Sequence, residues 1–129
     1  MLHALPYKKY IFTNARETEA LQALSALGIR DCFEDKVYGA DFLGDICKPQ
    51  KEAFTNVLDD IGVSPTSCVF FEDSVKNLTM GKTLGMATVL VQGFTSQEEG
   101  DLPDIFDAVV STLTDGGDEL KEKYPALFN

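Results

Sequence analysis

Several ingredients of common enzyme sites are scarce in this sequence. The single histidine, His3, lies in a terminal segment without clear periodicity, so we expect no Ser-His-Asp or Cys-His site around it. Three cysteines, at positions 32, 47 and 68, form neither a CxxC motif nor a His-rich spacing. This argues against a disulfide framework and a structural zinc site, and favours a reducing, cytoplasmic location. No stretch approaches the roughly 20 apolar residues of a membrane span.

Basic residues are also few. The chain has 11 Lys and Arg against 21 Asp and Glu, a net charge of -10 at pH 7. Because such a charge repels phosphate backbones and anionic lipid heads, we expect neither nucleic acid nor a membrane as a partner. A length of 129 residues suits one domain that buries about two thirds of its unfolded surface. We expect one domain over residues 1–129, with residues 1–9 as a loose N-terminal segment.

What the sequence does contain is a regular alternation of short apolar runs and amphipathic segments. The apolar runs predict strands near residues 10–13, 36–40, 68–73, 87–93 and 107–113. Periodic segments predict helices near residues 14–27, 49–61, 74–84 and 118–124. The spacing is typical of right-handed parallel crossovers. It predicts an α/β fold, most simply a three-layer, doubly wound parallel sheet.

Local signals mark the ends of these elements. Asn14 and Glu17 have the spacing of a capping box, and Gly28 suits a left-handed helix stop. Pro49 suits the first position of the next helix. The run CVFFED, residues 68–73, does not alternate, which predicts a strand buried on both faces.

Polar groups follow three of the predicted strands, at the sheet edge where open parallel sheets bind ligands. Thr13 and Asn14 precede a helix whose first N–H groups would attract a phosphate, although Asn14 could equally be an ordinary cap. Lys48 stands before the next helix, where the helix dipole disfavours a cation and so indicates an anion nearby. The alternative for Lys48 is a solvated surface lysine.

Two adjacent carboxylates, Glu72 and Asp73, follow the most apolar run. Such a pair suits a hydrated Mg²⁺, which takes oxygen ligands and keeps several waters. Alternatively, Asp73 or Ser74 caps the next helix and Glu72 is a first-turn charge. A hydroxyl, an ammonium and a metal-binding carboxylate at successive strand ends are the groups that phosphoryl transfer needs around one phosphate.

In this order, IFTNA, KP and FFEDSVKN resemble the second, third and fourth motifs of the haloacid dehalogenase (HAD) superfamily. The closer resemblance is to its pyrimidine 5'-nucleotidase-like phosphatases, and it runs from Tyr10 to the terminal PALF. It implies a Mg²⁺-dependent hydrolase of a small, nucleotide-like phosphomonoester. Receiver domains fit less well, because they present Asp, Thr and Lys, whereas the order here is Thr13, Lys48, Asp73.

The resemblance also implies roles for single residues. Thr13 and the Asn14 backbone would hold the phosphoryl oxygens, and Lys48 would offset the negative charge of the nucleophile and the phosphate. Asp73 would coordinate Mg²⁺, and Glu72 would assist through water.

Two neighbours of the acidic pair would support it. Asn77 falls where many family members have a second acidic residue, so the charge is lost while hydrogen-bonding capacity stays. Ser74 belongs to the same motif and could cap the helix that follows.

One motif of the family is missing. No Asp-x-Asp, the source of the nucleophile, a metal ligand and the general acid/base, occurs in the sequence. Only nine residues precede YIFTN, so we expect a partial HAD-type core without its first strand and cap, inactive as a phosphatase by itself. One alternative is a non-catalytic binding or interaction module that self-associates through exposed strand edges. Another is a generic α/β domain in which these residues are caps and surface charges.

Overall fold

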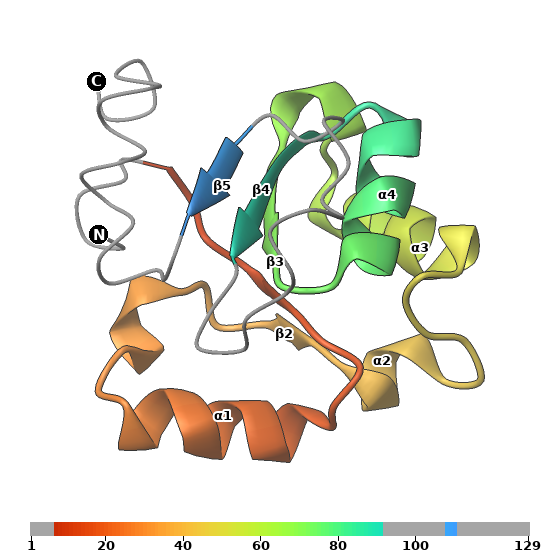
Figure 1. The fold of residues 1–129 in the computed structure, drawn as a ribbon. Helices are drawn as coiled ribbons and strands as arrows, with labels where there is room; N and C mark the ends of the chain where they lie inside the picture. Colours follow the sequence, from red (N-terminus) through yellow and green to blue (C-terminus); the bar gives the residue numbers. More distant parts are fainter. Residues whose placement is uncertain (1–6, 92–107, 111–129) are drawn as a thin grey trace. The chain divides into compact units, whose positions relative to one another are not determined.

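The computed structural model describes residues 7–91 and 108–110 (Figure 1). The chain divides at Gly62 and Val63 into two compact units. We call residues 7–62 the N-terminal unit, and residues 63–91 with 108–110 the C-terminal unit. Each has its own sheet, and the strand pairs of the described residues are all parallel, which confirms the predicted α/β class. A single domain over residues 1–129 stays a prediction.

The N-terminal unit has a two-stranded sheet with helices before and after the second strand. Its elements are β1 (Ile11–Phe12), α1 (Glu17–Ala26), η2 (Arg30–Cys32), β2 (Val37–Tyr38), α2 (Ala40–Leu43) and α3 (Lys51–Ile61). In the sheet, Ile11 lies opposite Val37 and Phe12 opposite Tyr38. The sequence predicted both strands, although each is shorter than expected, and it did not predict α2.

Aromatic side chains dominate the core of the N-terminal unit. The ring of Phe12 packs edge-on against Phe54 at 5.1 Å between centroids, and Tyr38 against Phe42 at 4.9 Å. Helix α3 buries four residues at helical spacing, which confirms its predicted apolar face; they are Ala53, Phe54, Val57 and Leu58. The contacts of β1 and β2 with this helix hold the end of β1 in place.

A polar cluster closes one side of this core. The Tyr38 hydroxyl donates to Asp60 Oδ2 at 2.8 Å, and Lys36 Nζ lies 2.7 Å from the same oxygen. Burial and the Asp60 carboxylate raise the pKa of Tyr38 to about 12. The Tyr38 ring is therefore neutral at every physiological pH and can remain inside the core.

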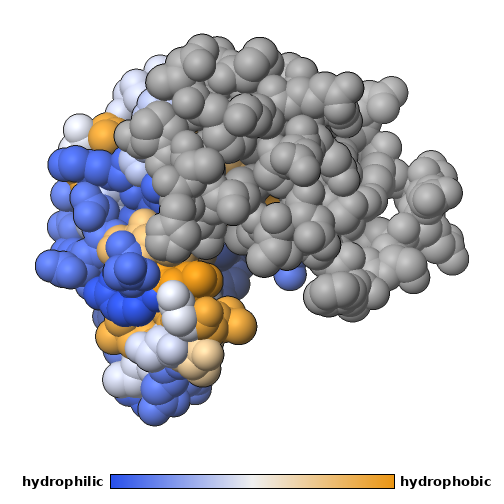
Figure 2. All heavy atoms as spheres, turned by 90° about the vertical axis from the view of Figure 1, so that its left-hand side faces the viewer, coloured by the Kyte–Doolittle hydropathy of each residue, from blue (hydrophilic) through white to orange (hydrophobic). Residues whose placement is uncertain are grey.

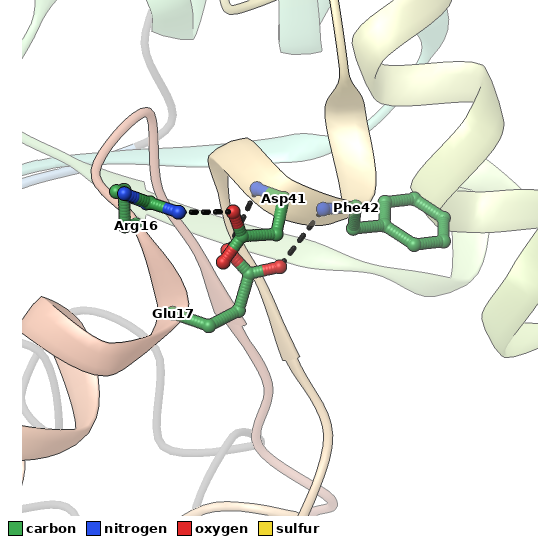
Figure 3. Close-up of polar contacts among 4 residues, drawn as sticks. All are labelled: Arg16, Glu17, Asp41 and Phe42. Atoms are coloured by element: carbon green, nitrogen blue, oxygen red, sulfur yellow. Dashed lines mark hydrogen bonds and ion pairs between the residues drawn. The ribbon is translucent and has the colours of Figure 1, made fainter.

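The capping box predicted from Asn14 and Glu17 is wrong. Helix α1 begins at Glu17, and its N-cap residue, Arg16, makes no side-chain cap. The Glu17 carboxylate instead accepts hydrogen bonds from the N–H groups of Asp41 and Phe42, each at 2.9 Å (Figure 3). Glu17 thus joins the start of α1 to α2, two segments far apart in the sequence.

Space around this contact is tight. A Cβ atom on Gly39 would overlap the Glu17 carboxylate and lie 2.6 Å from the Ala15 carbonyl oxygen. The Ala40 N–H donates to that same carbonyl at 2.8 Å. The turn after β2 therefore requires a residue without a side chain.

The amphipathic pattern of α1 overstates its burial. Of the apolar residues that predicted the helix, Leu24 is buried, whereas Leu27 is 71% exposed. Figure 2 shows a face on which the described residues are mostly hydrophilic, with hydrophobic residues gathered in its lower part. The stop after the helix is confirmed, because Gly28 has a φ of 71°.

Helix α3 begins later than Pro49 suggested. Its first residue is Lys51 and its N-cap is Gln50, so Pro49 lies in the turn before the helix. The Lys48-Pro49 peptide bond is cis. The helix ends at Gly62, which has a φ of 85°, as the sequence predicted.

The C-terminal unit is a three-stranded parallel sheet in the order β3-β4-β5, with α4 between β3 and β4. Its elements are η3 (Pro65–Ser67), β3 (Val69–Glu72), α4 (Val75–Leu84), β4 (Ala87–Val91) and β5 (Ala108–Val110). The expectation that β3 is buried on both faces is wrong, since Val69 is 37% exposed while Phe70 is buried.

Gly81 lets α4 lie close to β3. A Cβ atom at this position would lie 2.9 Å from Phe70 Cδ2 and 3.6 Å from the Met86 sulfur. Phe70 and Met86 are themselves buried, so neither has free space into which it could move. The absence of a side chain at Gly81 therefore sets the distance between helix and strand.

Two predictions lie outside the described residues. One is the loose N-terminal segment, of which residues 1–6, including His3, are not described; the other is the helix near residues 118–124. Within residues 7–91 and 108–110, no helix is long and apolar enough to cross a membrane.

We expect Glu17→Gln to lower the free energy of unfolding by about 1 kcal/mol at pH 7, because Gln offers one acceptor where the carboxylate offers two. Partial burial disfavours the ionised form, but the hydrogen bonds from Asp41 and Phe42 outweigh it and lower the pKa of Glu17 below its ordinary 4.5. A lowered pKa stabilises the fold above pH 4.5, and this contribution is lost as the pH falls through the folded value.

The difference between wild type and Glu17→Gln should therefore shrink in urea unfolding as the pH falls below 4.5. The control is Glu19→Gln, a neighbouring exposed carboxylate on α1. A difference that is the same at neutral and acidic pH would contradict the role of the Glu17 charge.

Gly81→Ala tests the approach of α4 to β3. Intrinsic helix propensity favours Ala by about 1 kcal/mol, whereas overpacking against Phe70 costs about 1–3 kcal/mol. We expect a net loss of stability, seen as a lower melting temperature in circular dichroism. Lys76→Ala, at an exposed position of the same helix, is the control and should be nearly neutral. A Gly81→Ala variant that melts above wild type would show that the contact is not tight.

Candidate functional site

The candidate residues of the N-terminal unit meet at the end of β1. We call Thr13, Asn14 and Lys48 the lysine corner. Lys48 is only 6% exposed, so its interpretation as a solvated surface lysine is wrong. Its Nζ donates to the Phe12 carbonyl oxygen at 2.8 Å and lies 4.7 Å from the centroid of the Phe12 ring. The ammonium thus points back to β1 rather than to the start of α3, where the dipole argument placed it.

Asn14 holds the main chain of Lys48. Its Oδ1 accepts from the Lys48 N–H at 2.9 Å, and its Nδ2 donates to the Lys48 carbonyl at 3.2 Å. The interpretation of Asn14 as a helix cap is therefore wrong, because its carboxamide bonds a residue 34 positions away.

Thr13 lies in the sequence between the two residues that anchor Lys48. They are Phe12, which accepts from its ammonium, and Asn14, which bonds its main chain. Its N–H donates to the Tyr38 carbonyl at 2.9 Å, which continues the pairing of β1 with β2. Its Oγ1 accepts from the Ala15 N–H at 3.0 Å, a local turn that fixes the side chain. A hydroxyl that accepts in this way keeps its own hydrogen for donation, so Thr13 can donate to an anion.

The corner as a whole suits an anion. A buried ammonium has lost part of its hydration, and a neighbouring negative charge compensates for that loss. The lysine corner combines this cation with a hydroxyl donor at the carboxyl end of a parallel strand, which is where ligands bind in such sheets.

The candidate residues of the C-terminal unit gather where β3 ends and α4 begins. We call Glu72, Asp73, Ser74 and Asn77 the acidic corner. Asn77 Nδ2 donates to Glu72 Oε1 at 2.7 Å, and Asn77 N–H donates to Ser74 Oγ at 3.4 Å. Ser74 is therefore the N-cap of α4, which confirms one of its two interpretations. Asn77 is buried, and its hydrogen bond fixes the direction of the Glu72 carboxylate.

The donors of the acidic corner fit Mg²⁺ in kind. Glu72 and Asp73 are adjacent carboxylates, and Asp73 is exposed, so both can present oxygen to a cation. Within residues 7–91 and 108–110, no three His, Cys, Asp or Glu residues form a metal-binding group. Mg²⁺ is commonly bound by one or two carboxylates and several waters, so this pair is sufficient in kind.

The sequence did not reveal the partners of these residues. Phe12 contributes its carbonyl oxygen and its ring to the Lys48 ammonium, and it was predicted only as a strand residue. A main-chain acceptor has no signature in the sequence.

Comparisons with known proteins identify the family of the chain. A family model described as haloacid dehalogenase-like hydrolase matches residues 1–85. The CBBY-like protein of Arabidopsis thaliana is 29% identical over 92 residues, which are 67% of this chain and 27% of that protein. YhcW of Bacillus subtilis, named as a candidate phosphatase, is 37% identical over 68 residues, 53% of this chain and 30% of its own length.

A solved structure supports the fold. The HAD phosphatase of Thermococcus onnurineus superposes with a TM-score of 0.70 at 28% identity, over 94% of this chain and 53% of that one. The chain thus spans about half of this structure and less than a third of the two curated relatives. With a family model that covers residues 1–85, the chain belongs to the haloacid dehalogenase-like hydrolases.

Proposed function

We propose that this chain carries the phosphate-binding and metal-binding parts of a Mg²⁺-dependent phosphatase of small, nucleotide-like phosphomonoesters, and that it is inactive by itself. The observation that carries the proposal is the burial of Lys48, whose ammonium donates to the carbonyl oxygen of Phe12, the residue before Thr13. Membership of the hydrolase family and the likeness to a HAD phosphatase support the phosphatase class.

In this proposal the lysine corner holds the phosphoryl group. The Lys48 ammonium offsets its negative charge, and the Thr13 hydroxyl donates to one of its oxygens. At an effective dielectric constant of about 20, two unit charges ~4 Å apart interact by about 4 kcal/mol. Desolvation of both ions consumes part of that energy, so the net contribution is smaller.

The acidic corner would hold Mg²⁺ through Asp73, with Glu72 acting directly or through water. When bound, the metal neutralises charge on phosphoryl oxygens. Asn77 keeps Glu72 in one orientation, and Ser74 fixes the start of α4 beneath the pair. These two residues support the site without touching the substrate.

The sequence contains no Asp-x-Asp, the motif that the family resemblance makes the source of the nucleophile. Positioning and a metal alone leave only slow attack by water. The preference for nucleoside 5'-monophosphates rests on the resemblance to pyrimidine 5'-nucleotidases. The cytoplasmic location rests on the cysteine pattern, and both stay predictions.

The first test of the proposal is phosphate binding. We expect Lys48→Met to weaken the binding of inorganic phosphate at least about tenfold, because Met retains the unbranched apolar stem and removes the cation. Titrations followed by ¹⁵N NMR would report the dissociation constant. Lys51→Met, at the exposed first residue of α3, is the matched control and should bind as wild type. Equal affinity in wild type and Lys48→Met would exclude the lysine corner as the phosphate site.

The second test is turnover. We expect no hydrolysis of nucleoside monophosphates above the buffer rate when the purified chain is incubated with Mg²⁺, measured as released phosphate. Asp73→Asn is the informative variant, because it removes the main metal ligand with little change in shape. Clear Mg²⁺-dependent turnover that Asp73→Asn abolishes would overturn the predicted inactivity.

The alternative is a non-catalytic interaction module, including self-association through strand edges, and it also stays a prediction. An Asp-x-Asp encoded upstream of Met1 in the same reading frame would decide for the phosphatase. A stable dimer that binds Mg²⁺ weakly and hydrolyses nothing would favour the module.

A further inference from the structure

The contact between Asn14 and Lys48 is bidentate. One carboxamide accepts from the N–H of Lys48 and donates to its carbonyl oxygen, at 2.9 and 3.2 Å. Both bonds go to the main chain of a single residue, so they fix the backbone of Lys48 and leave its side chain to other partners. The Asn carboxamide can make both bonds because it carries an acceptor oxygen and a donor NH₂ group, whereas an Asp carboxylate of the same length only accepts at neutral pH.

Lys48 is therefore held at both ends by residues that flank Thr13. Asn14 holds its main chain, and the carbonyl oxygen of Phe12 accepts from its ammonium at 2.8 Å. Because Phe12, Thr13 and Asn14 are consecutive, the chain direction at the end of β1 determines where the Lys48 ammonium lies relative to the Thr13 hydroxyl. Thr13 is fixed in turn by its bonds to Tyr38 and Ala15.

We propose that Asn14 is a positioning residue, whose carboxamide sets the Lys48 ammonium beside the Thr13 hydroxyl and does not itself bind phosphate. This inference rests on the proposed phosphate site at the lysine corner. It assigns the Asn14 side chain a role different from that of the backbone N–H, which the family resemblance associates with phosphoryl oxygens. The side chain is committed to Lys48, so loss of the carboxamide acts on phosphate only through the lysine.

The experiment compares Asn14→Ala with wild type by ¹⁵N NMR of the full chain at neutral pH. The first measurement is hydrogen exchange at the Lys48 amide, and the second is titration with inorganic phosphate, followed at the Thr13 and Lys48 amides. We expect Asn14→Ala to lose the protection of the Lys48 amide and to bind phosphate about tenfold more weakly, as two lost hydrogen bonds imply. Asn56→Ala, at an exposed position of α3, is the matched Asn-to-Ala control and should change neither measurement.

A second variant separates the two bonds. Asn14→Asp keeps an acceptor for the Lys48 N–H but faces the Lys48 carbonyl with an oxygen instead of a donor. We expect partial protection of the Lys48 amide and weakened phosphate binding. The added carboxylate also repels phosphate, so in Asn14→Asp the supporting readout is the partial loss of protection at the Lys48 amide. If Asn14→Ala does not fold, full protection of that amide or wild-type phosphate affinity in Asn14→Asp would overturn the proposal.

The outcomes distinguish the two levels of inference. Phosphate affinity that is unchanged in Asn14→Ala while the Lys48 amide loses protection would show that the contact is structural only, and would overturn the positioning role. Unchanged protection would overturn it too. A wild-type chain that binds no phosphate would instead refute the proposed function, and the positioning role of Asn14 in that function would fall with it, whatever the amide exchange shows.

Discussion

The burial of the Lys48 ammonium is the constraint on which the N-terminal unit depends. A cation that leaves water must find acceptors, and here the acceptor is the carbonyl oxygen of Phe12, the last residue of β1. That requirement ties the segment before α3 to the end of a strand far away in the sequence. The edge-on contact of Phe12 with Phe54 then couples the same strand to the core. Strand, lysine and helix are thus fixed as one arrangement.

A second polar contact restrains the neighbouring turn. The Glu17 carboxylate fixes α2 through two main-chain N–H groups, and Gly39 makes room for it (Figure 3). The C-terminal unit uses the same means at its own strand end, where Asn77 joins Glu72 to the first turn of α4. In both units a polar side chain in the first turn of a helix holds residues at or just after the end of a strand, while apolar packing holds the strand itself.

The elements that depend on local sequence were predictable. The apolar face of α3 and the glycine stops at Gly28 and Gly62 follow from spacing and from backbone conformations that only glycine adopts easily. The roles of Asn14, Glu17 and Lys48 were not, because their partners lie 24 to 36 positions away. Asn14 and Glu17 have the pattern of a local cap, and the competing long-range bonds prevailed. The sequence identified the residues of the lysine corner. It explained Lys48 by the dipole of the helix that follows, whereas the ammonium binds the Phe12 carbonyl oxygen at the end of β1.

The position of Thr13 between two anchoring residues has a consequence for ligand affinity. A flexible hydroxyl and a flexible ammonium would each lose rotational freedom when an anion ordered them, by about 0.5–1.5 kcal/mol per side chain. Here the Thr13 side chain is already oriented by Ala15, and the Lys48 chain is already extended to Phe12. Because of this preorganisation, the side-chain entropy of Thr13 and Lys48 is lost when the chain folds and not when an anion binds. More of the interaction energy between the anion and these side chains then appears as binding free energy.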